Sequence, residues 1–365
     1  MRVALVHDYI KEYGGAERVL EALHEIWPNA PVFTSIYLPE FLGPHKNRFK
    51  NWDIRTSFLQ YLPFKKKLIS SFRLITPFVF KMFDFSKFDL VIVSATGAYN
   101  PNMINKKTAL QICYCHTPPR YLYGFATARD WKKNLFFKVL GEIANHFLRL
   151  VDYKSAQNVD FFIANSRNIA GRIKKFYRRN STVIYPPIEM NQESRIKNQE
   201  KKNYYLAGGR LARPKHIDLI IKTFEKLDLP LKVFGKSFAG VNLQSKNFNI
   251  ELLGEVSDEE KTELMRNAKA FVFAAEDEDF GITPVEAMSV GTPVVAYRSG
   301  GVVESIVHGK TGLFFDQLTV ESFFKAVRDF GREKFDRELI MNHAQKFSKE
   351  RFKKAMKDFV GNHAK

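Results

Sequence analysis

Two glutamates separated by seven residues, Glu278 and Glu286, stand where a buried apolar run gives way to a helix. Each carboxylate can accept several hydrogen bonds, so the pair suits the hydroxyls of a sugar. Glu278 is expected in the turn after the strand Phe271–Ala275, and Glu286 on the first turn of the helix that follows. Two purely structural roles are also possible: an acidic surface turn for Glu278, and for Glu286 a capping box with Thr283.

The expected start of that helix would favour an anion. Phe280, Gly281 and Ile282 lead into the helix, with Thr283 expected at the N-cap and Pro284 at the first helical position. The free N–H groups and the dipole of a helix start attract negative charge. A diphosphate would suit this position.

The run Asp277-Glu278-Asp279 has the pattern D-x-D, which can bind a metal ion together with a diphosphate. A solvated acidic loop is the alternative. Basic residues elsewhere in the chain can neutralise phosphate oxygens without a metal. We therefore expect neither a metal ion nor another cofactor.

Basic residues follow the expected strand Tyr204–Ala207. Gly208-Gly209 would let the backbone approach a ligand closely. Arg210 then offers a planar fork for phosphate oxygens, and Lys215 a mobile point charge. In a chain with 57 lysines and arginines, such a pair also arises by chance. Its place at the carboxyl end of a strand is what favours a phosphate site.

The first half of the chain has two further candidate sites at strand ends. Gly14-Gly15 follows the strand Val3–Val6 and begins a helix, which would allow close approach of a phosphate or a sugar. The pair does not form G-x-G-x-x-G, so a dinucleotide site lacks its main support. His116 follows the strand Leu110–Cys115, where it could face a ligand or serve as a structural hydrogen-bonding group.

Two basic features could each serve more than one purpose. Arg120, in the loop after His116, could contact an anionic acceptor or a donor phosphate, or it could be a surface cation. The segment Tyr61–Phe85 mixes five lysines and arginines with many aromatic residues, which suits an anionic membrane surface. A helical pair with a solvated basic face and a nucleic-acid-binding surface are the alternatives.

Short apolar runs alternate with segments of helical period, which predicts an α/β fold with parallel sheets covered by helices. The polar stretch Glu189–Asn203 is the expected linker between two Rossmann-like domains, at 1–190 and 204–345. The expected strands are Val3–Val6, Leu90–Val93, Leu110–Cys115, Phe161–Ala164, Val183–Tyr185, Tyr204–Ala207, Leu231–Phe234, Ile250–Leu253, Phe271–Ala275, Pro293–Tyr297 and Leu313–Phe315. Ligands of such sheets bind beyond the carboxyl ends of the strands.

Composition narrows the class of protein. The 365 residues are 45% hydrophobic, enough for two ordinary cores. The sequence contains no run of about 18 apolar residues, so we expect no transmembrane helix. The N-terminus has no signal-peptide pattern. Cys113 and Cys115 are too few for a disulfide framework, so we expect a cytoplasmic protein with reduced thiols. The net charge of +18 attracts anions: nucleic acid, an anionic membrane and a phosphorylated small molecule all fit.

Taken together, these residues resemble the family 4 retaining glycosyltransferases of the GT-B fold. The resemblance covers nearly the whole chain and rests on Gly14-Gly15, His116, Arg210 with Lys215, and Glu278 and Glu286 with Phe280-Gly281. It implies two Rossmann-like domains with parallel sheets facing across a cleft, the first for the acceptor and the second for a nucleotide-sugar donor. The last helix, 348–360, would pack back on the first domain.

The resemblance implies a role for each residue of the second domain. Glu286 would hold the ribose hydroxyls of the donor. Glu278, with the backbone N–H groups of Phe280 to Thr283, would hold the transferred sugar. Arg210 and Lys215 would neutralise the diphosphate as it leaves.

In the first domain, the resemblance implies that Gly15 lets the domain close on the donor and that His116 contacts the sugar near the anomeric centre. Transfer would retain the configuration by front-face attack, with the leaving phosphate helping to deprotonate the acceptor hydroxyl. Preorganised cations would stabilise the growing negative charge.

Within the family, the segments YCHTPPRYLYG, VDFFIANSRNIAGRIKKFYRRNSTVIYPPI and EDFGITPVEA are most similar to bacterial O-antigen mannosyltransferases that use GDP-mannose. The run PRYLY at 119–123 departs from the MRYAW more usual there. The similarity implies transfer of mannose to a lipid-linked or cell-envelope saccharide, as in lipopolysaccharide synthesis, at the inner face of the cytoplasmic membrane. The alternatives are a UDP-sugar donor, a nucleotide-sugar epimerase of the same fold, and a nucleic-acid-binding protein.

Overall fold

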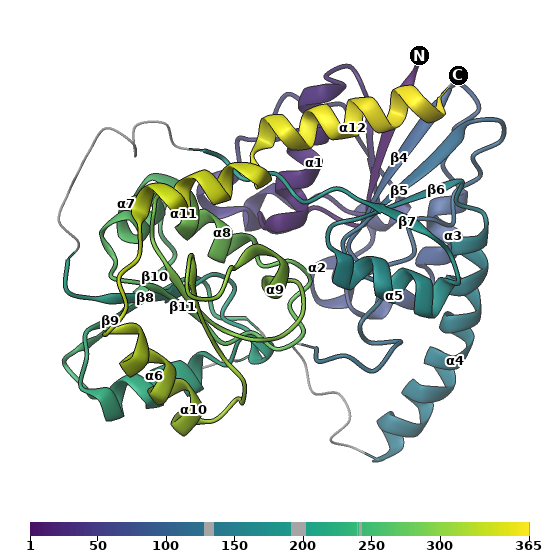
Figure 1. Ribbon diagram of the computed structural model, residues 1–365. Helices are drawn as coiled ribbons and strands as arrows, with labels where there is room; N and C mark the ends of the chain where they lie inside the picture. The colour runs from purple at the N-terminus through teal and green to yellow at the C-terminus, as the bar shows by residue number, and fades with distance from the viewer. Residues whose placement is uncertain (128–134, 191–201, 239, 241–242, 365) are drawn as a thin grey trace. The chain divides into compact units, whose positions relative to one another are not determined.

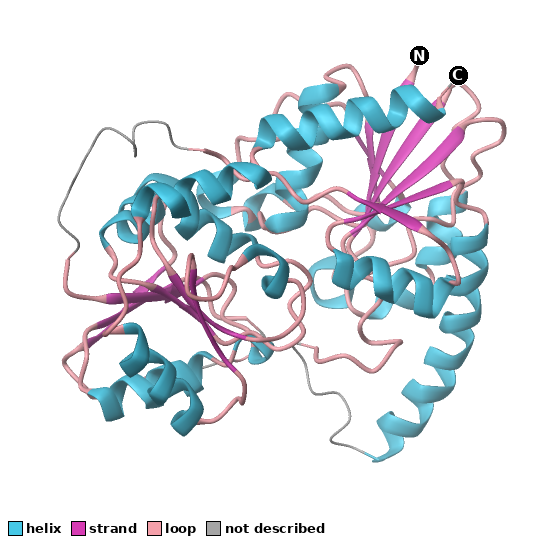
Figure 2. Cartoon of the chain, viewed as in Figure 1, coloured by secondary structure: helices cyan, strands magenta, loops and turns pink. Residues whose placement is uncertain are grey.

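A parallel β-sheet forms the centre of each of two units in the computed structural model, which describes residues 1–127, 135–190, 202–238, 240 and 243–364 (Figures 1 and 2). The first unit comprises Met1–Phe125, Trp131–Pro187 and Glu350–Lys365, and the second comprises Ala126–Asp130 and Ile188–Lys349. The predicted α/β class with parallel sheets is confirmed. Most of the expected linker, from 191 to 201, lies outside the described residues.

The sheet of the first unit has the order β3-β2-β1-β4-β5-β6-β7 within the described chain, and all its strand pairs are parallel. Its strands are β1 (Val3–His7), β2 (Val32–Thr34), β3 (Ile54–Thr56), β4 (Leu90–Ala95), β5 (Leu110–Cys115), β6 (Phe161–Ala164) and β7 (Ser181–Val183). β5 and β6 have the predicted bounds, whereas β2 and β3 were not predicted. The edge strand β7 begins and ends two residues before the predicted Val183–Tyr185.

Helices cover both faces of this sheet (Figure 1). On one face, α1 (Gly15–Ile26) and the C-terminal helix α12 (Lys349–His363) share a core with β1, β4 and β5. Phe352, Met356 and Val360 of α12 are buried there. The other face carries α3 (Thr76–Lys81), the end of α4 (Leu135–Gln157) and α5 (Arg167–Tyr177). The two cores fix the carboxyl ends of β1, β4 and β5 side by side.

The sheet of the second unit has the order β10-β9-β8-β11-β12-β13, again with parallel pairs. Its strands are β8 (Tyr205–Gly208), β9 (Leu231–Phe234), β10 (Ile250–Gly254), β11 (Phe271–Phe273), β12 (Val294–Tyr297) and β13 (Gly312–Phe315). β9 has the predicted bounds. β11 ends two residues before the predicted Ala275, because the chain leaves the sheet there to form the acidic turn.

The helices of the second unit also lie on two faces (Figure 2). α6 (Ile217–Leu227) and α10 (Val320–Phe330) pack on one face, where Phe224 and Phe323 are completely buried. On the other face, α8 (Ile282–Ser289) contacts both α7 (Asp258–Asn267) and α11 (Arg337–Ala344), and α9 (Val302–Ser305) follows β12. β8 and β11 are neighbours, so the two chain segments with predicted site residues leave the sheet side by side.

The segment Tyr61–Phe85, for which a partly buried helical pair was one alternative, forms short helices. It contains α2 (Lys65–Leu68) and α3, joined by a 3-10 turn at Ser71–Leu74. Val79 and Phe80 are buried against the sheet, whereas Phe78 and Met82 are 68% and 70% exposed. The segment is thus anchored on one side and presents apolar side chains to solvent on the other.

Candidate active site

The predicted site residues fall into two sets, one in each unit. In the second unit the acidic turn 276–281 joins β11 to α8. The N-cap of α8 is Gly281, whose φ of 88° lies in the left-handed region that glycine tolerates. The prediction of Thr283 as N-cap and Pro284 as first helical residue is therefore wrong. The helix begins at Ile282, and Pro284 still lies in the first turn, where its missing N–H has no intrahelical partner to lose.

Lys215 and Glu278 are brought together by the fold. Lys215 ends the 3-10 turn after β8, and its ammonium donates a hydrogen bond to the Glu278 carboxylate. Their side chains are 25% and 20% exposed, and the Lys215 ammonium also lies 4.9 Å from the centre of the Phe273 ring. A cation and a carboxylate from two neighbouring strand ends thus share one polar site.

Glu286 has a different partner from the one that its spacing suggests. Its Oε1 lies 3.0 Å from the ammonium of Lys261 on α7, and both side chains are largely buried. Glu286 lies in the second turn of α8, because the helix starts at Ile282. The structure shows no capping box with Thr283, and the carboxylate is oriented by a neighbouring helix. Lys261 was missed, since nothing in the sequence links it to Glu286.

Glycines fix the backbone around Glu278. A Cβ added at Gly300 would lie 2.1 Å from the carbonyl oxygen of Glu278, and one at Gly301 would lie 2.2 Å from that of Asp279. The Gly301 N–H donates to the Glu278 carbonyl at 2.6 Å. Gly300-Gly301 follows β12 and was given no role from the sequence. Only glycine allows this approach, so Gly300-Gly301 packs directly on the backbone of the acidic turn and holds it in place.

Gly209 and Arg210 occupy the expected place after β8. A Cβ at Gly209 would lie 3.6 Å from Thr283 Oγ1, so the backbone passes close to the start of α8. The guanidinium of Arg210 lies 5.0 Å from the centre of the Phe238 ring. Phe280 is buried against Phe347, with 5.4 Å between ring centres. Gly209, Lys215, Glu278 and the start of α8 therefore border one polar region.

In the first unit, Gly14 is the N-cap of α1 and Gly15 its first residue. The Gly14 N–H donates to Glu17 Oε2 at 2.9 Å. That N–H is consequently bound by the chain itself, a contact that the predicted approach of a phosphate or a sugar to the glycine pair did not include. Glu17 is 5% exposed, so a carboxylate is held inside the unit at the start of α1.

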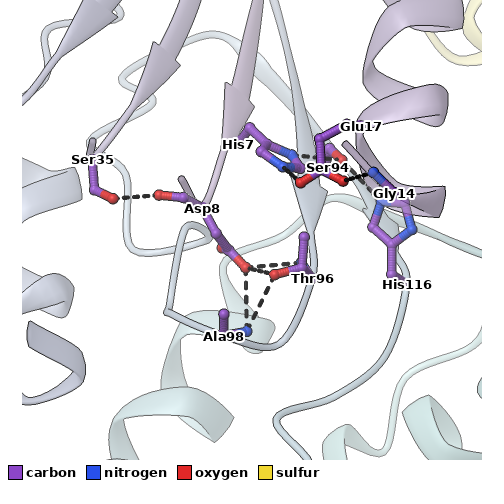
Figure 3. A network of polar contacts seen from close by, with 9 residues as sticks. All are labelled: His7, Asp8, Gly14, Glu17, Ser35, Ser94, Thr96, Ala98 and His116. Carbon is purple, nitrogen blue, oxygen red and sulfur yellow. Dashed lines mark hydrogen bonds and ion pairs between the residues drawn. The ribbon is translucent and has the colours of Figure 1, made fainter. Parts of the chain in front are cut away.

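His116 lies at the end of β5 as predicted, in a line of buried polar side chains (Figure 3). Its Nε2 lies 2.9 Å from Ser94 Oγ, and Ser94 Oγ lies 3.1 Å from His7 Nδ1. Burial, with a contribution from His7, lowers the pKa of His116 to about 3. The ring is neutral near pH 7 and can form hydrogen bonds without carrying charge.

Asp8 is a second buried group next to this line (Figure 3). Its Oδ2 accepts the backbone N–H groups of Thr96, at 3.0 Å, and Ala98, at 3.3 Å, and also the Thr96 hydroxyl. Burial raises the pKa of the Asp8 carboxyl, although His7 opposes the shift. Asp8, His7 and Ser94 were missed, because none belongs to a recognisable spacing. They are brought together only by the alignment of β1 with β4.

Arg120 lies in the loop after His116, where its carbonyl accepts the Phe125 N–H at 3.1 Å. Asp277 has a φ of 52°, and its N–H donates to Ser299 Oγ at 3.2 Å.

Over the described ranges of the chain, no group of three or more His, Cys, Asp or Glu side chains is arranged to hold a metal ion. Over the same ranges, no helix is both long and apolar enough to cross a bilayer.

Residues 189–352 match the family Glycosyl transferases group 1. An uncharacterized glycosyltransferase, MJ1178 of Methanocaldococcus jannaschii, is 26% identical over 197 residues, covering 53% of this chain and 55% of that protein. The alpha-1,3/1,6-mannosyltransferase ALG2 of Rhizomucor pusillus is 23% identical over 320 residues, covering 73% of this chain and 68% of the relative. The structure of Anabaena Alr3699/HepE with UDP and glucose aligns with a TM-score of 0.70 at 15% identity, covering 99% and 100% of the two chains.

The family match covers most of the second unit, and the chain has the GT-B fold. The predicted fold is confirmed, and the family match agrees with the predicted resemblance to glycosyltransferases. The chain spans about half the length of the first curated relative that it matches. The relationship to O-antigen enzymes stays a prediction.

Proposed function

We propose that this protein is a retaining hexosyltransferase that moves a sugar from a nucleoside diphosphate to a saccharide acceptor. The observation that carries the proposal is the contact of Lys215 with Glu278 beside the start of α8, inside the matched family domain. A cation, a carboxylate and the backbone N–H groups of a helix start at one strand edge suit a diphosphate joined to a sugar.

The roles follow from the chemistry of each group. Lys215, with Arg210, neutralises the departing diphosphate. In the donor complex the Glu278 carboxylate accepts hydroxyls of the transferred sugar, while the N–H groups of Phe280 to Thr283 face its oxygens. Glu286, held by Lys261, accepts the ribose hydroxyls. Since Lys215 already contacts Glu278, the donor enters a site whose charges are arranged in advance.

Mannose is the sugar that we propose, because the name of the matching ALG2 protein is that of a mannosyltransferase. GDP is the proposed carrier, as the resemblance to enzymes that use GDP-mannose implies. A UDP sugar is the alternative, since the HepE structure contains UDP and glucose. A nucleotide-sugar epimerase is a further alternative, as is a nucleic-acid-binding protein. We propose no metal cofactor, because Arg210 and Lys215 supply the positive charge that a metal would bring.

A donor panel tests the proposal. The protein is incubated with labelled GDP-mannose, UDP-glucose or UDP-N-acetylglucosamine, with and without a lipid-linked oligosaccharide. We expect transfer or slow hydrolysis with GDP-mannose only. Activity confined to a UDP sugar would refute the mannose donor, and a new nucleotide sugar formed without acceptor would identify an epimerase.

We also propose a peripheral contact with an anionic membrane from the cytoplasmic side, which would bring a lipid-linked acceptor to the protein. In the segment Tyr61–Phe85, Phe64, Phe78 and Met82 are each about 70% exposed, next to exposed Lys66 and Lys81. Apolar side chains among cations suit the interface of anionic lipids. α4 of the same unit also has an exposed apolar side, with Val139, Leu140, Ile143, Phe147 and Leu150.

A further inference from the structure

Three buried side chains form a hydrogen-bonded line across the carboxyl ends of β1, β4 and β5: His7, Ser94 and His116 (Figure 3). His7 and Ser94 are direct partners in the parallel pairing of β1 with β4. His116 follows the last residue of β5, and its backbone N–H donates to the carbonyl of Ala95 at the end of β4. The line is thus fixed by the register of three neighbouring strands.

The single hydroxyl between two imidazoles links their protonation. Ser94 Oγ has one hydrogen, so it can donate to one ring nitrogen only, and the other ring must donate to the Ser94 oxygen. If His7 Nδ1 accepts from Ser94, then His116 Nε2 carries a hydrogen and its Nδ1 is bare. If the direction is reversed, the hydrogen of His116 is on Nδ1.

Glu17 determines the direction of this line. Its Oε2 accepts the Gly14 N–H, and its Oε1 lies 3.6 Å from His7 Nε2. That nitrogen is fully buried, and no hydrogen-bond partner for it exists in the described part of the chain. A carboxylate beside Nε2 favours a hydrogen on that atom. In the neutral His7 ring, Nδ1 is then a hydrogen-bond acceptor.

We infer that Glu17, His7 and Ser94 act as positioning residues that keep the hydrogen of His116 on Nε2, so that His116 Nδ1 accepts a hydroxyl of the substrate. The last clause rests on the proposed hexosyltransferase function and on the contact with the sugar that the family resemblance implies for His116. Such a ring recognises a hydroxyl hydrogen and cannot donate to a ring oxygen or to a phosphate from Nδ1. The line therefore determines which partner donates the hydrogen in one contact with the sugar.

Nitrogen NMR of protein labelled with ¹⁵N-histidine tests this inference, with the His116 signals assigned by their loss in His116→Gln. We expect an N–H at Nε2 and a bare nitrogen at Nδ1 in the wild type. Glu17→Gln removes the charge but keeps an oxygen for the Gly14 N–H. It should make the Nδ1–H form of His116 detectable and lower kcat about tenfold, with the donor KM within about twofold.

Glu21→Gln on the same helix is the matched control, because Glu21 contacts Tyr13 and Arg48 in place of His7. Its His116 signals and its kcat should equal those of the wild type. A hydrogen on Nδ1 in the wild type, or unchanged His116 signals in Glu17→Gln, would overturn the inference. If Glu17→Gln does not fold, Ser94→Ala tests the same line and should yield both forms of His116. The NMR result stands even if the transfer assay refutes the proposed function.

Discussion

The ammonium of Lys261 on α7 lies 3.0 Å from the carboxylate of Glu286 on α8 and 3.0 Å from that of Asp258. One cation therefore connects two carboxylates from two helices, and the Lys261 and Glu286 side chains are only 13% and 12% exposed. Glu286 is the residue proposed to hold the donor ribose. Its orientation depends on a lysine that lies 25 residues earlier in the chain.

Lys261→Met should leave the Glu286 carboxylate buried without this partner. We expect the donor KM to rise about tenfold and the free energy of unfolding to fall by about 1 to 2 kcal/mol. Initial-rate kinetics and urea unfolding measure the two effects. Lys222→Met on α6 is the control, since Lys222 is exposed and lies 4.0 Å from Asp218. Equal KM values in Lys261→Met and the wild type would contradict a role for the pair in donor binding.

Glu278→Ala should reduce transfer by at least about 100-fold, because the carboxylate proposed to hold the sugar is lost. The circular dichroism spectrum and melting temperature should change little, since Glu278 lies in a turn that is braced by backbone contacts. Glu276→Ala is the matched control, because that carboxylate pairs with His216 at 3.3 Å. Transfer near the wild-type rate in Glu278→Ala would show that the site is wrongly placed.

Chelation tests the proposal that transfer needs no metal ion. Activity in excess EDTA should equal that in buffer alone, because Arg210 and Lys215 supply the positive charge at the diphosphate. Asp279→Asn should likewise leave the rate unchanged in the presence or absence of Mn²⁺. Loss of activity in EDTA that Mn²⁺ restores would instead support a metal site at Asp277-Glu278-Asp279.

Asp152 should make stability depend on pH. Burial raises the pKa of its carboxyl to about 6, against hydrogen bonds from Tyr123, Tyr177 and Asn100. The folded protein therefore binds this proton more tightly than the unfolded chain. The stabilisation is complete below about pH 4 and disappears as the pH rises through about 6, a loss of about 3 kcal/mol.

Asp152→Asn should remove this pH dependence, since the amide stays neutral and can still accept the Asn100 N–H. Urea unfolding of both proteins between pH 4 and pH 7 provides the measurement. The wild type should lose about 3 kcal/mol relative to the variant over that interval. Parallel stability curves for the two proteins would contradict a raised pKa at Asp152.

Phe78→Ser with Met82→Ser should weaken binding to vesicles that contain phosphatidylglycerol by about tenfold or more, because both side chains are about 70% exposed next to lysines. Vesicle co-sedimentation at low and high salt measures the affinity. Leu339→Ser in the second unit, also at an exposed apolar residue, is the control. Equal sedimentation of the double variant and the control would contradict a membrane contact at α3.

The sequence predicted well those elements whose pattern is local. β5, β6 and β9 are buried apolar runs bounded by polar or turn residues, and their predicted limits agree with the structure. β2 and β3 have three residues each, too few to show a period, so they were missed. Thr283 has the type of an N-cap residue, yet Gly281 caps the helix, because the chain turns through a left-handed conformation that glycine adopts most easily.

The partners of the site residues could not be predicted in the same way. Ser94 lies between His7 and His116 only because β4 is placed between β1 and β5, and no spacing encodes that order. Lys261 reaches Glu286 through the packing of α7 on α8. Sequence patterns therefore indicated which side chains could do chemistry, whereas register and helix packing determined what orients them.

Gly300 and Gly301 matter for any attempt to change the sugar that we propose for this site. Both glycines contact the backbone of Glu278 and Asp279 closely. These contacts should keep the backbone of the turn in place when its side chains are exchanged. A library aimed at new substrates should vary Asp277 and Asp279 and keep Glu278, the buried Phe280 and both glycines, since a side chain at either glycine would displace the whole turn.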